Sequence, residues 1–383
     1  MDMSRFRYAS TSFIGLLALA VTATLIGPSF PLIKNEFGLS LGLLGFLASA
    51  WSAGYLFSLI GGFLSDQYGE FTIISSSLII VGIVTALISV APSYDQLLIL
   101  FLLGGVGSAF GEAGMNPLMA KLFPKRSGFA LNVLHVFYSL GSFIGPILAG
   151  LVIASYGSWR LSYLMMAIFF GPLIVVSILT SQELHKENTM NLRIRESSNG
   201  VSTVEILKKG HALMLAGFFY LGAEVGTNAW LPTFLVLVRN FSIELAGLSL
   251  GLFWGAMATG RLILGSVTDR LRFRRTILLS SVLSTILIFA GITITNQLWI
   301  VILWSLSGFV LGPVMPTIFV LASRLFPKRS GFATGVIYGV GFGGVFSPWL
   351  LGVLADMLSL KQAMLYLTFS VLAISISIVT MND

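Results

Sequence analysis

The chain has 383 residues, of which 56% are apolar and only 10% are charged, and its formal net charge is +7. A soluble protein would carry about 25% charged residues, so this composition excludes an ordinary soluble globular protein. The sequence contains no cysteine, which excludes disulfides, thiolate chemistry and cysteine-ligated metals.

Long stretches without charged residues divide the sequence into twelve apolar segments, and a membrane-spanning helix needs about 20 such residues. Six segments precede a polar linker at 182–210 and six follow it. We therefore expect an all-α membrane protein with twelve transmembrane helices in two pseudo-symmetric six-helix bundles, at 1–181 and 211–383. The first segment is too long for a signal peptide and lacks a clear cleavage site, so we expect it to be retained. The predicted spans are 9–33, 41–64, 72–92, 96–119, 128–153, 160–181, 211–237, 245–267, 277–294, 298–322, 331–354 and 362–380.

The basic residues fall mainly in alternate loops. If both termini are cytoplasmic, 17 of the 22 Lys and Arg residues lie inside, four lie outside, and Arg261 lies within a span. Cytoplasmic loops carry such an excess of basic residues, so we expect both termini in the cytoplasm and a multi-pass protein of the plasma or inner membrane. The positive net charge then reflects topology and gives no support for nucleic-acid binding.

The nine residues LFPKRSGFA occur twice, at Leu122–Ala130 and Leu325–Ala333, and both copies fall in predicted cytoplasmic loops. Matched residues elsewhere share the same offset of 203 positions, which indicates an internal duplication. In each copy the proline is expected to end the preceding helix, and Ser127 or Ser330 to cap the next one.

Two other loops match at the same offset. GFLSDQYG at Gly62–Gly69 follows the second span, and GSVTDRLRFRR at Gly265–Arg275 follows the eighth. Both resemble the G-x-L-x-D-R-x-G-R-[RK] motif of the major facilitator superfamily, and the twelve spans in two halves extend the resemblance to the whole chain. The first copy departs from the motif, because Gln67 and Glu70 stand where the family has basic residues.

In that family the motif's aspartate meets the start of a helix in the opposite half and helps to hold one gate closed. By resemblance, Asp66 would face the helix that starts near Gly331, and Asp269 the helix that starts near Gly128. A carboxylate at a helix N-terminus is stabilised by about 0.3–1 kcal/mol, which is weak enough to break in each cycle. The predicted gating residues are Gly62, Asp66, Gly69, Arg126, Gly265, Asp269, Arg270 and Arg329.

Three charged residues lie inside predicted spans: Glu112, Glu224 and Arg261. A charge at the bilayer centre costs about 2.5–3.5 kcal/mol on insertion scales, so each is a functional candidate. Each glutamate has an asparagine four residues on, Asn116 or Asn228, on the same helical face. Such polar pairs also serve as structural hydrogen bonds between helices. Arg261 lies near the inner end of its span, so we assign it to a gate or to packing and expect no basic residue beside these polar faces in mid-membrane.

EAGMNP at Glu112–Pro117 resembles the E-x-x-x-N-P stretch of fucose permeases, in which this glutamate takes up the coupled proton and reaches the sugar. Asn132 and His135 resemble positions on their fifth helix, and Gly222–Glu224 resembles the seventh helix of the sodium-linked glucose transporter group. Those permeases carry an aspartate in the first helix, where this chain has Thr24. The resemblance implies coupling to a proton or sodium ion at Glu112, with or without Glu224.

Neutral sugars are bound by amide and carboxyl groups together with an aromatic face. The expected lack of a basic residue near these groups argues against phosphate or carboxylate solutes. We therefore expect cation-coupled uptake of a neutral polyhydroxy solute such as a hexose. The predicted cation-coupling residues are Glu112 and Glu224, and the predicted substrate-binding residues are Asn116, Asn132, His135, Tyr138, Tyr220, Asn228 and Trp230.

The glycines Gly141 and Gly145 partly match the antiporter motif of drug exporters, so the alternative function is a proton-coupled exporter of drugs or other lipophilic compounds. The same spacing also serves close helix packing. A sensor would need a larger soluble domain than the linker at 182–210. The sequence shows no metal-ligand spacing and no nucleophile–base pair, so we expect no enzyme, no cofactor and no metal. The expected partners are the solute, a coupling proton or sodium ion and the lipid bilayer, around a monomer that binds no nucleic acid.

Overall fold

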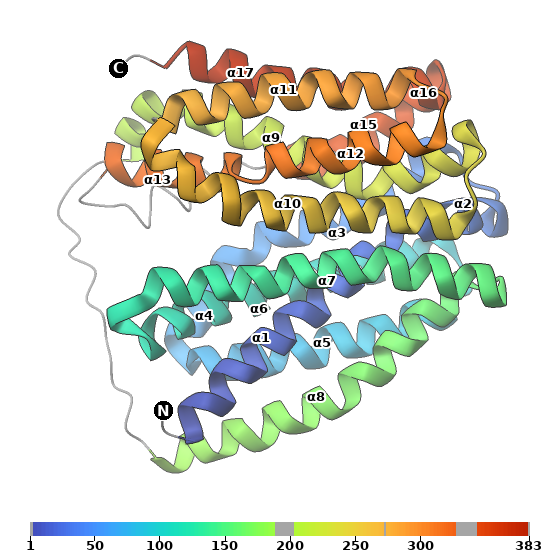
Figure 1. Cartoon of the computed structure of the whole chain (residues 1–383). Coiled ribbons are helices and arrows are strands. Elements are labelled where there is room, and N and C mark those ends of the chain that lie inside the picture. Colours follow the sequence, from blue (N-terminus) through green and yellow to red (C-terminus); the bar gives the residue numbers. More distant parts are fainter. Residues whose placement is uncertain (1–2, 188–202, 272, 327–342, 382–383) are drawn as a thin grey trace. The chain divides into compact units, whose positions relative to one another are not determined.

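The described part of the chain is all-helical in the computed structural model (Figure 1). Backbone groups in lipid must be satisfied within the segment itself, which favours helices for long apolar stretches. Among the described residues, eleven helical stretches are long and apolar enough to cross a membrane, and they match eleven predicted spans. The twelfth, predicted at 331–354, is described only from Gly343 onward. The structure describes residues 3–187, 203–271, 273–326 and 343–381, without the side chains of 3–4, 127–129, 182–187, 203–208 and 266–271.

The chain divides into two compact units, of which the first comprises Met1–Phe37 and Ala50–Arg195. Within this unit α5 packs against α6 and α8, and α1 packs against α7 (Figure 1). Its helices are α1 (Met3–Thr24), α2 (Ile26–Phe37), the end of α3 (Leu41–Gly54), the 3-10 turn η1 (Tyr55–Phe57), α4 (Ser58–Tyr68), α5 (Glu70–Val90), α6 (Tyr94–Leu122), the 3-10 turn η2 (Pro124–Arg126), α7 (Ser127–Tyr156) and α8 (Trp159–Glu187).

The second unit comprises Gly38–Ser49 and Glu196–Asp383, so the first part of α3 belongs to it. Within this unit α9 packs against α15 and α17, and α12 packs against α10 and α11. Its other helices are α9 (Thr203–Arg239), α10 (Ile243–Leu271), α11 (Phe273–Thr293), α12 (Gln297–Leu311), α13 (Val314–Leu325), α15 (Gly343–Met357), α16 (Leu360–Ala363) and α17 (Leu365–Val379).

Two predicted spans are broken by prolines. The first is interrupted at Leu25, between α1 and α2. Pro28 has no N–H to offer the carbonyl of Thr24, and its ring would crowd that carbonyl in a continuous helix. In the same way Pro313 separates α12 from α13 and deprives the Phe309 carbonyl of its helical partner. Both breaks lie inside otherwise apolar stretches.

The two copies of the repeated nonapeptide begin with the same backbone geometry. Phe123 ends α6 with φ −125° and ψ 59°, and Phe326 ends α13 with φ −128° and ψ 63°. The predicted cap at Ser127 is wrong. Ser127 is the first residue of α7, Arg126 takes the N-cap position, and no side chain caps it, because the turn η2 already leads into the helix. The predicted cap at Ser330 lies outside the described residues.

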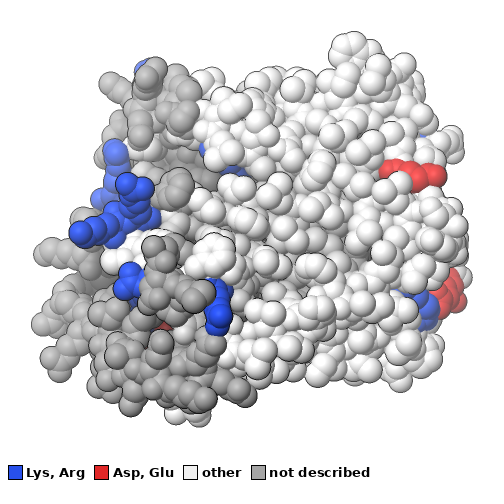
Figure 2. All heavy atoms as spheres, turned by 60° about the horizontal axis from the view of Figure 1, so that its bottom comes forward, with Lys and Arg blue, Asp and Glu red and all other residues white. Residues whose placement is uncertain are grey.

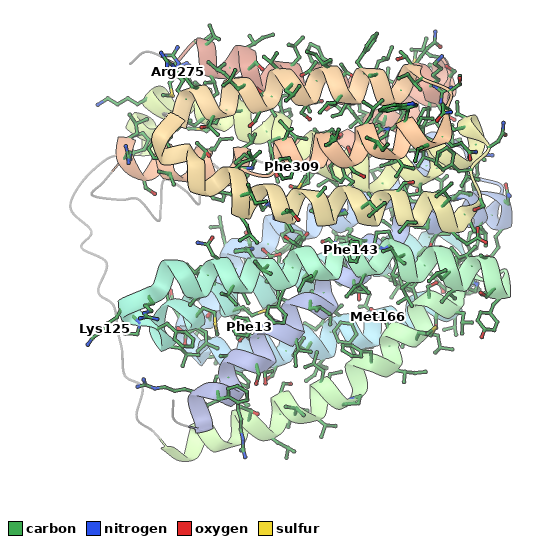
Figure 3. All side chains as sticks on the ribbon, in the orientation of Figure 1. Phe13, Lys125, Phe143, Met166, Arg275 and Phe309 are labelled. Atoms are coloured by element: carbon green, nitrogen blue, oxygen red, sulfur yellow. The ribbon has the colours of Figure 1, made fainter. Side chains whose placement is uncertain are left out.

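Charged side chains gather toward the ends of the helices. Figure 2 shows a surface of uncharged side chains over most of the helix length, with Lys, Arg, Asp and Glu toward the ends. In Figure 3, Lys125 and Arg275 lie at helix ends, whereas Phe143 and Met166 lie along the helices. Many large apolar side chains are also exposed, Leu59 by 84% among them. These surfaces suit contact with lipid rather than water, as expected for a multi-pass membrane protein.

Candidate functional site

Glu112 lies on α6, and its carboxylate accepts a hydrogen bond from a tyrosine. The Tyr55 hydroxyl donates to Glu112 Oε1 at 2.9 Å. The Glu112 side chain is half-buried. A phenol hydroxyl can donate to an ionised carboxylate and can also pair with the protonated acid. The contact is therefore compatible with both charge states of Glu112.

Tyr55 reaches Glu112 because the second span is broken. α3 ends at Gly54, and one 3-10 turn separates it from α4. Gly54 and Gly105 bring the backbones of α3 and α6 into contact, since a methyl group on either glycine would overlap backbone atoms of the other helix. Tyr55 is not among the site residues predicted from the sequence. A tyrosine in the middle of the apolar stretch 41–64 is the signal that points to it.

Asn116 lies one turn beyond Glu112 on α6, but the two side chains do not bond to each other. Asn116 Nδ2 donates to the backbone carbonyl of Glu112 at 3.0 Å. Asn116 Oδ1 is buried and has no hydrogen-bond partner among the described residues. A buried polar atom without a partner costs about 1–3 kcal/mol. Asn116 Oδ1 is therefore an unsatisfied acceptor one turn from Glu112.

Three of the predicted substrate-binding residues lie on α7 of the first unit. Asn132 and His135 are exposed, and Tyr138 is half-buried. On α1, Phe13 stacks on Phe137 of α7 with ring centroids 5.0 Å apart (Figure 3). α7 thus packs its aromatic side chain on α1 and leaves Asn132 and His135 accessible.

In the second unit, Glu224 of α9 forms an ion pair with Arg261 of α10. Arg261 Nη2 lies 3.1 Å from Glu224 Oε1. The same nitrogen donates to the Tyr220 hydroxyl at 3.3 Å, and that hydroxyl donates to Glu224 Oε1 at 3.5 Å. Arg261 Nη2 also lies 3.4 Å from Met257 Sδ. Tyr220 and Met257 are buried, whereas the Glu224 and Arg261 side chains remain 13% and 22% exposed.

A second polar contact links α9 and α10 one turn farther along α9. Asn228 Oδ1 accepts a hydrogen bond from Trp254 Nε1 at 3.3 Å. Glu224 and Asn228, four residues apart on α9, thus face Arg261 and Trp254, seven residues apart on α10, and each spacing keeps one helical face. One polar face runs along both helices and holds Glu224, Asn228 and Arg261.

This arrangement contradicts one prediction. No basic residue is expected in mid-membrane beside the polar helical faces that carry Glu112 and Glu224, yet Arg261 contacts Glu224. The reason is the register of neighbouring helices, which brings Arg261 of α10 level with Glu224 of α9. A pattern read along one helix does not contain that register. A lack of basic residues therefore no longer argues against anionic solutes.

Glycines fix the backbone from which Arg261 extends. A methyl group on Gly260 would overlap the carbonyl oxygen of Phe309 on α12, a residue labelled in Figure 3. One on Gly312, at the break between α12 and α13, would lie 2.5 Å from the Met257 carbonyl and 2.7 Å from the Arg261 amide. α10 is thus in direct backbone contact with α12 and with the start of the break.

Trp230 is fully buried in the second unit. Its Nε1 donates to the carbonyl of Pro348 on α15 at 2.9 Å. In this structure the side chain links α9 to α15. The predicted contact between Trp230 and substrate stays a prediction.

Two residues of the first loop motif have a local structural explanation. Gly69, between α4 and α5, has φ +89° and ψ 144°, a conformation that favours glycine. Glu70, which departs from the family motif, forms an ion pair with Lys121 in the last turn of α6. Asp66 is exposed. Its predicted contact near Gly331 involves residues outside the described part of the chain.

The remaining predicted gating residues are only partly described. Arg126 is exposed at the end of η2. No described atom lies within 4 Å of a methyl group placed on Gly62 or Gly265. The side chains of Asp269 and Arg270 lie outside the described residues, as does all of Arg329.

Gly141 and Gly145 bring α7 close to α1. A methyl group on Gly141 would overlap the Leu17 carbonyl, and one on Gly145 would overlap the Thr24 hydroxyl. Close helix packing therefore accounts for this glycine spacing.

Comparison with known sequences identifies a family. Residues 12–348 match the sequence profile of the Major Facilitator Superfamily. A Thermus thermophilus protein named as a nitrate/nitrite antiporter is 28% identical over 383 residues, covering 90% of this chain and 84% of that protein. A Helicobacter pylori (strain J99) protein named as a glucose/galactose transporter is 26% identical over 279 residues, covering 67% of this chain and 65% of that protein. The two names refer to different solutes.

A solved structure has the same fold. It is a bacterial homologue of the human lysosomal transporter Spinster in an inward-facing and unoccupied conformation. The TM-score is 0.81 at 15% sequence identity, and the match covers 100% of this chain and 98% of that one. At this identity the likeness shows the fold alone.

Proposed function

Because the chain belongs to the major facilitator superfamily and is a transporter rather than an enzyme, we propose that it is a secondary active transporter that works by alternating access. It couples the uptake of a small polar solute to a proton or a sodium ion. The protein acts as a monomer in the plasma or inner membrane, with both termini cytoplasmic and with helical halves at 1–181 and 211–383. The loops that carry Asp66 and Asp269 form its cytoplasmic gate.

The observation that carries this proposal is the contact between Glu112 and Tyr55. A carboxyl group inside a membrane span is costly, so its presence is by default functional. The Tyr55 hydroxyl, 2.9 Å from Glu112 Oε1, supports the carboxyl group in either charge state. Glu112 can therefore take up and release a proton without the loss of its hydrogen bond.

The chemistry around Glu112 supports a solute with hydrogen-bonding groups. Asn116 Oδ1 is a buried acceptor without a partner among the described residues, and Asn132 and His135 are exposed on α7. A hexose has the matching hydroxyl groups, and one relative is named for glucose and galactose. A neutral hexose is therefore the solute that these residues of the first unit favour.

The alternative is a proton-coupled exporter of drugs or other lipophilic compounds, and one relative is named for fosmidomycin resistance. Its sequence basis was Gly141 and Gly145, and contact of α7 with α1 also accounts for both. We retain uptake of a polar solute as the proposed function.

The test uses purified protein in liposomes with an imposed proton or sodium gradient. Radiolabelled glucose, galactose, glucuronate, lactate and nitrate are offered outside, and accumulation is measured against exchange without a gradient. We expect one gradient to drive accumulation of at least one solute. Glu112→Gln should abolish that accumulation and leave part of the exchange, whereas Glu244→Gln, a control at an exposed carboxylate in the first turn of α10, should leave both. Equal loss of accumulation and exchange in Glu112→Gln would show that Glu112 does not couple.

A further inference from the structure

The ion pair of Glu224 and Arg261 places a guanidinium group inside a membrane span, where the proposed hexose does not require one. We propose that Arg261 binds the anionic group of the transported solute, a small monovalent carboxylate, and that Glu224 occupies the guanidinium when solute is absent. This inference rests on the proposed function and specifies its substrate class.

The contact between the two side chains is weaker than an arginine–carboxylate pair can be. Arg261 meets Glu224 through one nitrogen–oxygen contact of 3.1 Å, and the same nitrogen is shared with Tyr220 and Met257. Strong arginine–carboxylate pairs use two parallel N–H···O bonds. A solute carboxylate that makes two such bonds has an advantage over Glu224.

Neither side chain of the ion pair is fully enclosed. Tyr220 and Met257 are buried and contact Arg261 Nη2. The Arg261 side chain remains 22% exposed and the Glu224 side chain 13% exposed. The ion pair thus keeps some exposed surface, at which a solute can compete with Glu224.

The backbone beneath Arg261 is held in place. Gly260 and Gly312 bring α10 into direct contact with α12 and with the break before α13. A rigid element positions a binding group at lower entropic cost than a loop does. The guanidinium is therefore presented from a fixed position, as a binding site requires.

The charges balance in both the empty and the loaded state. In the empty state the positive Arg261 and the negative Glu224 sum to zero. On loading, Glu224 takes a proton from water and becomes a neutral acid, its ion pair with Arg261 breaks, and the solute carboxylate pairs with Arg261. One proton and one carboxylate then move together, and neither state carries a net charge through the low dielectric of the membrane.

The protonation of Glu224 depends on few neighbouring groups. Its described partners are Tyr220 on its own helix and Arg261 on α10. α13, α15, α16 and α17 also pack against α9, and their described side chains form no ion pair or hydrogen bond with Glu224. Arg261 is the one charged group among its described contacts, so a solute carboxylate that takes Arg261 removes the positive charge that opposes protonation of Glu224.

The test removes the internal carboxylate and keeps the guanidinium. Purified Glu224→Gln is titrated with acetate, lactate and glucuronate, with glucose as the neutral match of glucuronate, and the unfolding temperature is recorded. We expect saturable stabilisation by carboxylate at a concentration about tenfold lower than in the double variant Glu224→Gln/Arg261→Gln, because only the former keeps the guanidinium, to which a carboxylate can donate no proton but from which it accepts hydrogen bonds. Glucose should not distinguish the two proteins. An identical response of the two variants to all three carboxylates would overturn the proposal.

A second measurement covers the case in which Glu224→Gln does not fold. The unmodified protein is titrated with acetate at acid and at neutral pH beside the double variant. Stronger stabilisation at acid pH in the unmodified protein alone supports the proposal, and the same response in both proteins overturns it. Glu70→Gln, which removes the carboxylate from the Lys121 ion pair, should respond as the unmodified protein does.

The outcome separates this inference from the proposed function, because the titration uses no gradient. If carboxylates do not bind at Arg261 while a gradient still drives solute uptake, only the substrate class is wrong. If carboxylates bind but no gradient drives uptake of any solute, the proposed coupling is wrong.

Discussion

The carboxylate of Asp356 on α15 accepts a hydrogen bond from the backbone amide of Gly42 on α3 at 2.7 Å. Its other oxygen accepts from the Leu41 amide at 2.9 Å, and Ser40 Oγ accepts from Leu43 at 3.3 Å. The first amides of a helix have no partner within it. Side chains satisfy those of α3, and Asp356 does so from a helix more than 300 residues away.

We expect Asp356→Ala to lower the free energy of unfolding by about 1 kcal/mol, the typical value of a lost helix cap. Asp356→Asn should lose less, because its amide oxygen still accepts one bond. Thermal unfolding of the purified variants measures both changes. Asp66→Ala, which removes an exposed aspartate from α4, is the control, and a loss of stability in it equal to that of Asp356→Ala would refute the capping role.

The hydroxyl of Tyr55 should be needed for coupled uptake. It donates a hydrogen bond to Glu112 Oε1 at 2.9 Å, and a hydrogen bond to a charged group is worth about 1.5–3 kcal/mol. Tyr55→Phe removes this bond. We expect gradient-driven accumulation to fall about tenfold, while exchange without a gradient is partly retained.

The control for this prediction is Tyr156→Phe, at an exposed tyrosine at the end of α7. It should leave both accumulation and exchange unchanged. Equal loss of accumulation and exchange in Tyr55→Phe would mean that the hydroxyl only supports the fold.

The helices themselves could be predicted, because a long apolar stretch in a membrane has few alternatives to a helix. The breaks at Leu25 and at η1 could not be located so well. Pro28 marks the first break in the sequence, but η1 has no proline and depends on the contact between Gly54 and Gly105. Such a contact joins two segments, and the sequence of either segment does not reveal it.

The candidate site was predictable to the same extent. Glu112 and Glu224 are conspicuous because charge is scarce in the spans. Their partners Tyr55 and Arg261 come from neighbouring helices, and the register between helices is set by packing. The one clue to Arg261 is its spacing from Met257 and Trp254, which places the three on one face of α10.

Trp230 allows the substrate role and the packing role to be told apart. Its indole is fully buried and donates to the Pro348 carbonyl at 2.9 Å. We expect Trp230→Phe to lower the free energy of unfolding by about 1–3 kcal/mol, through the lost hydrogen bond and the smaller ring. The apparent affinity for the transported solute should not change.

Thermal unfolding and concentration-dependent uptake measure these two effects. Trp299→Phe alters a tryptophan that is 56% exposed on α12 and should change neither. If Trp230→Phe weakened solute affinity while stability remained normal, Trp230 would be a binding residue, as the sequence resemblance implies.

Two glycines on α10 should respond oppositely to the same substitution. A methyl group on Gly260 would overlap the Phe309 carbonyl, whereas no described atom lies within 4 Å of one on Gly265. We expect Gly260→Ala to destabilise the protein by about 1–3 kcal/mol, the cost of forcing helices apart. Gly265→Ala should keep or raise stability, because alanine favours a helix over glycine by about 1 kcal/mol.

The rate of solute uptake is a second measurement for the Gly260→Ala and Gly265→Ala variants. Gly265 belongs to the loop motif proposed as a gate, and its surroundings in this conformation leave room for a side chain. If Gly265→Ala retains stability but slows uptake, the glycine is needed in another conformation of the transport cycle, which supports the gating role. If it retains both, Gly265 is not part of the gate. Equal destabilisation by the two substitutions would contradict the helix contact at Phe309.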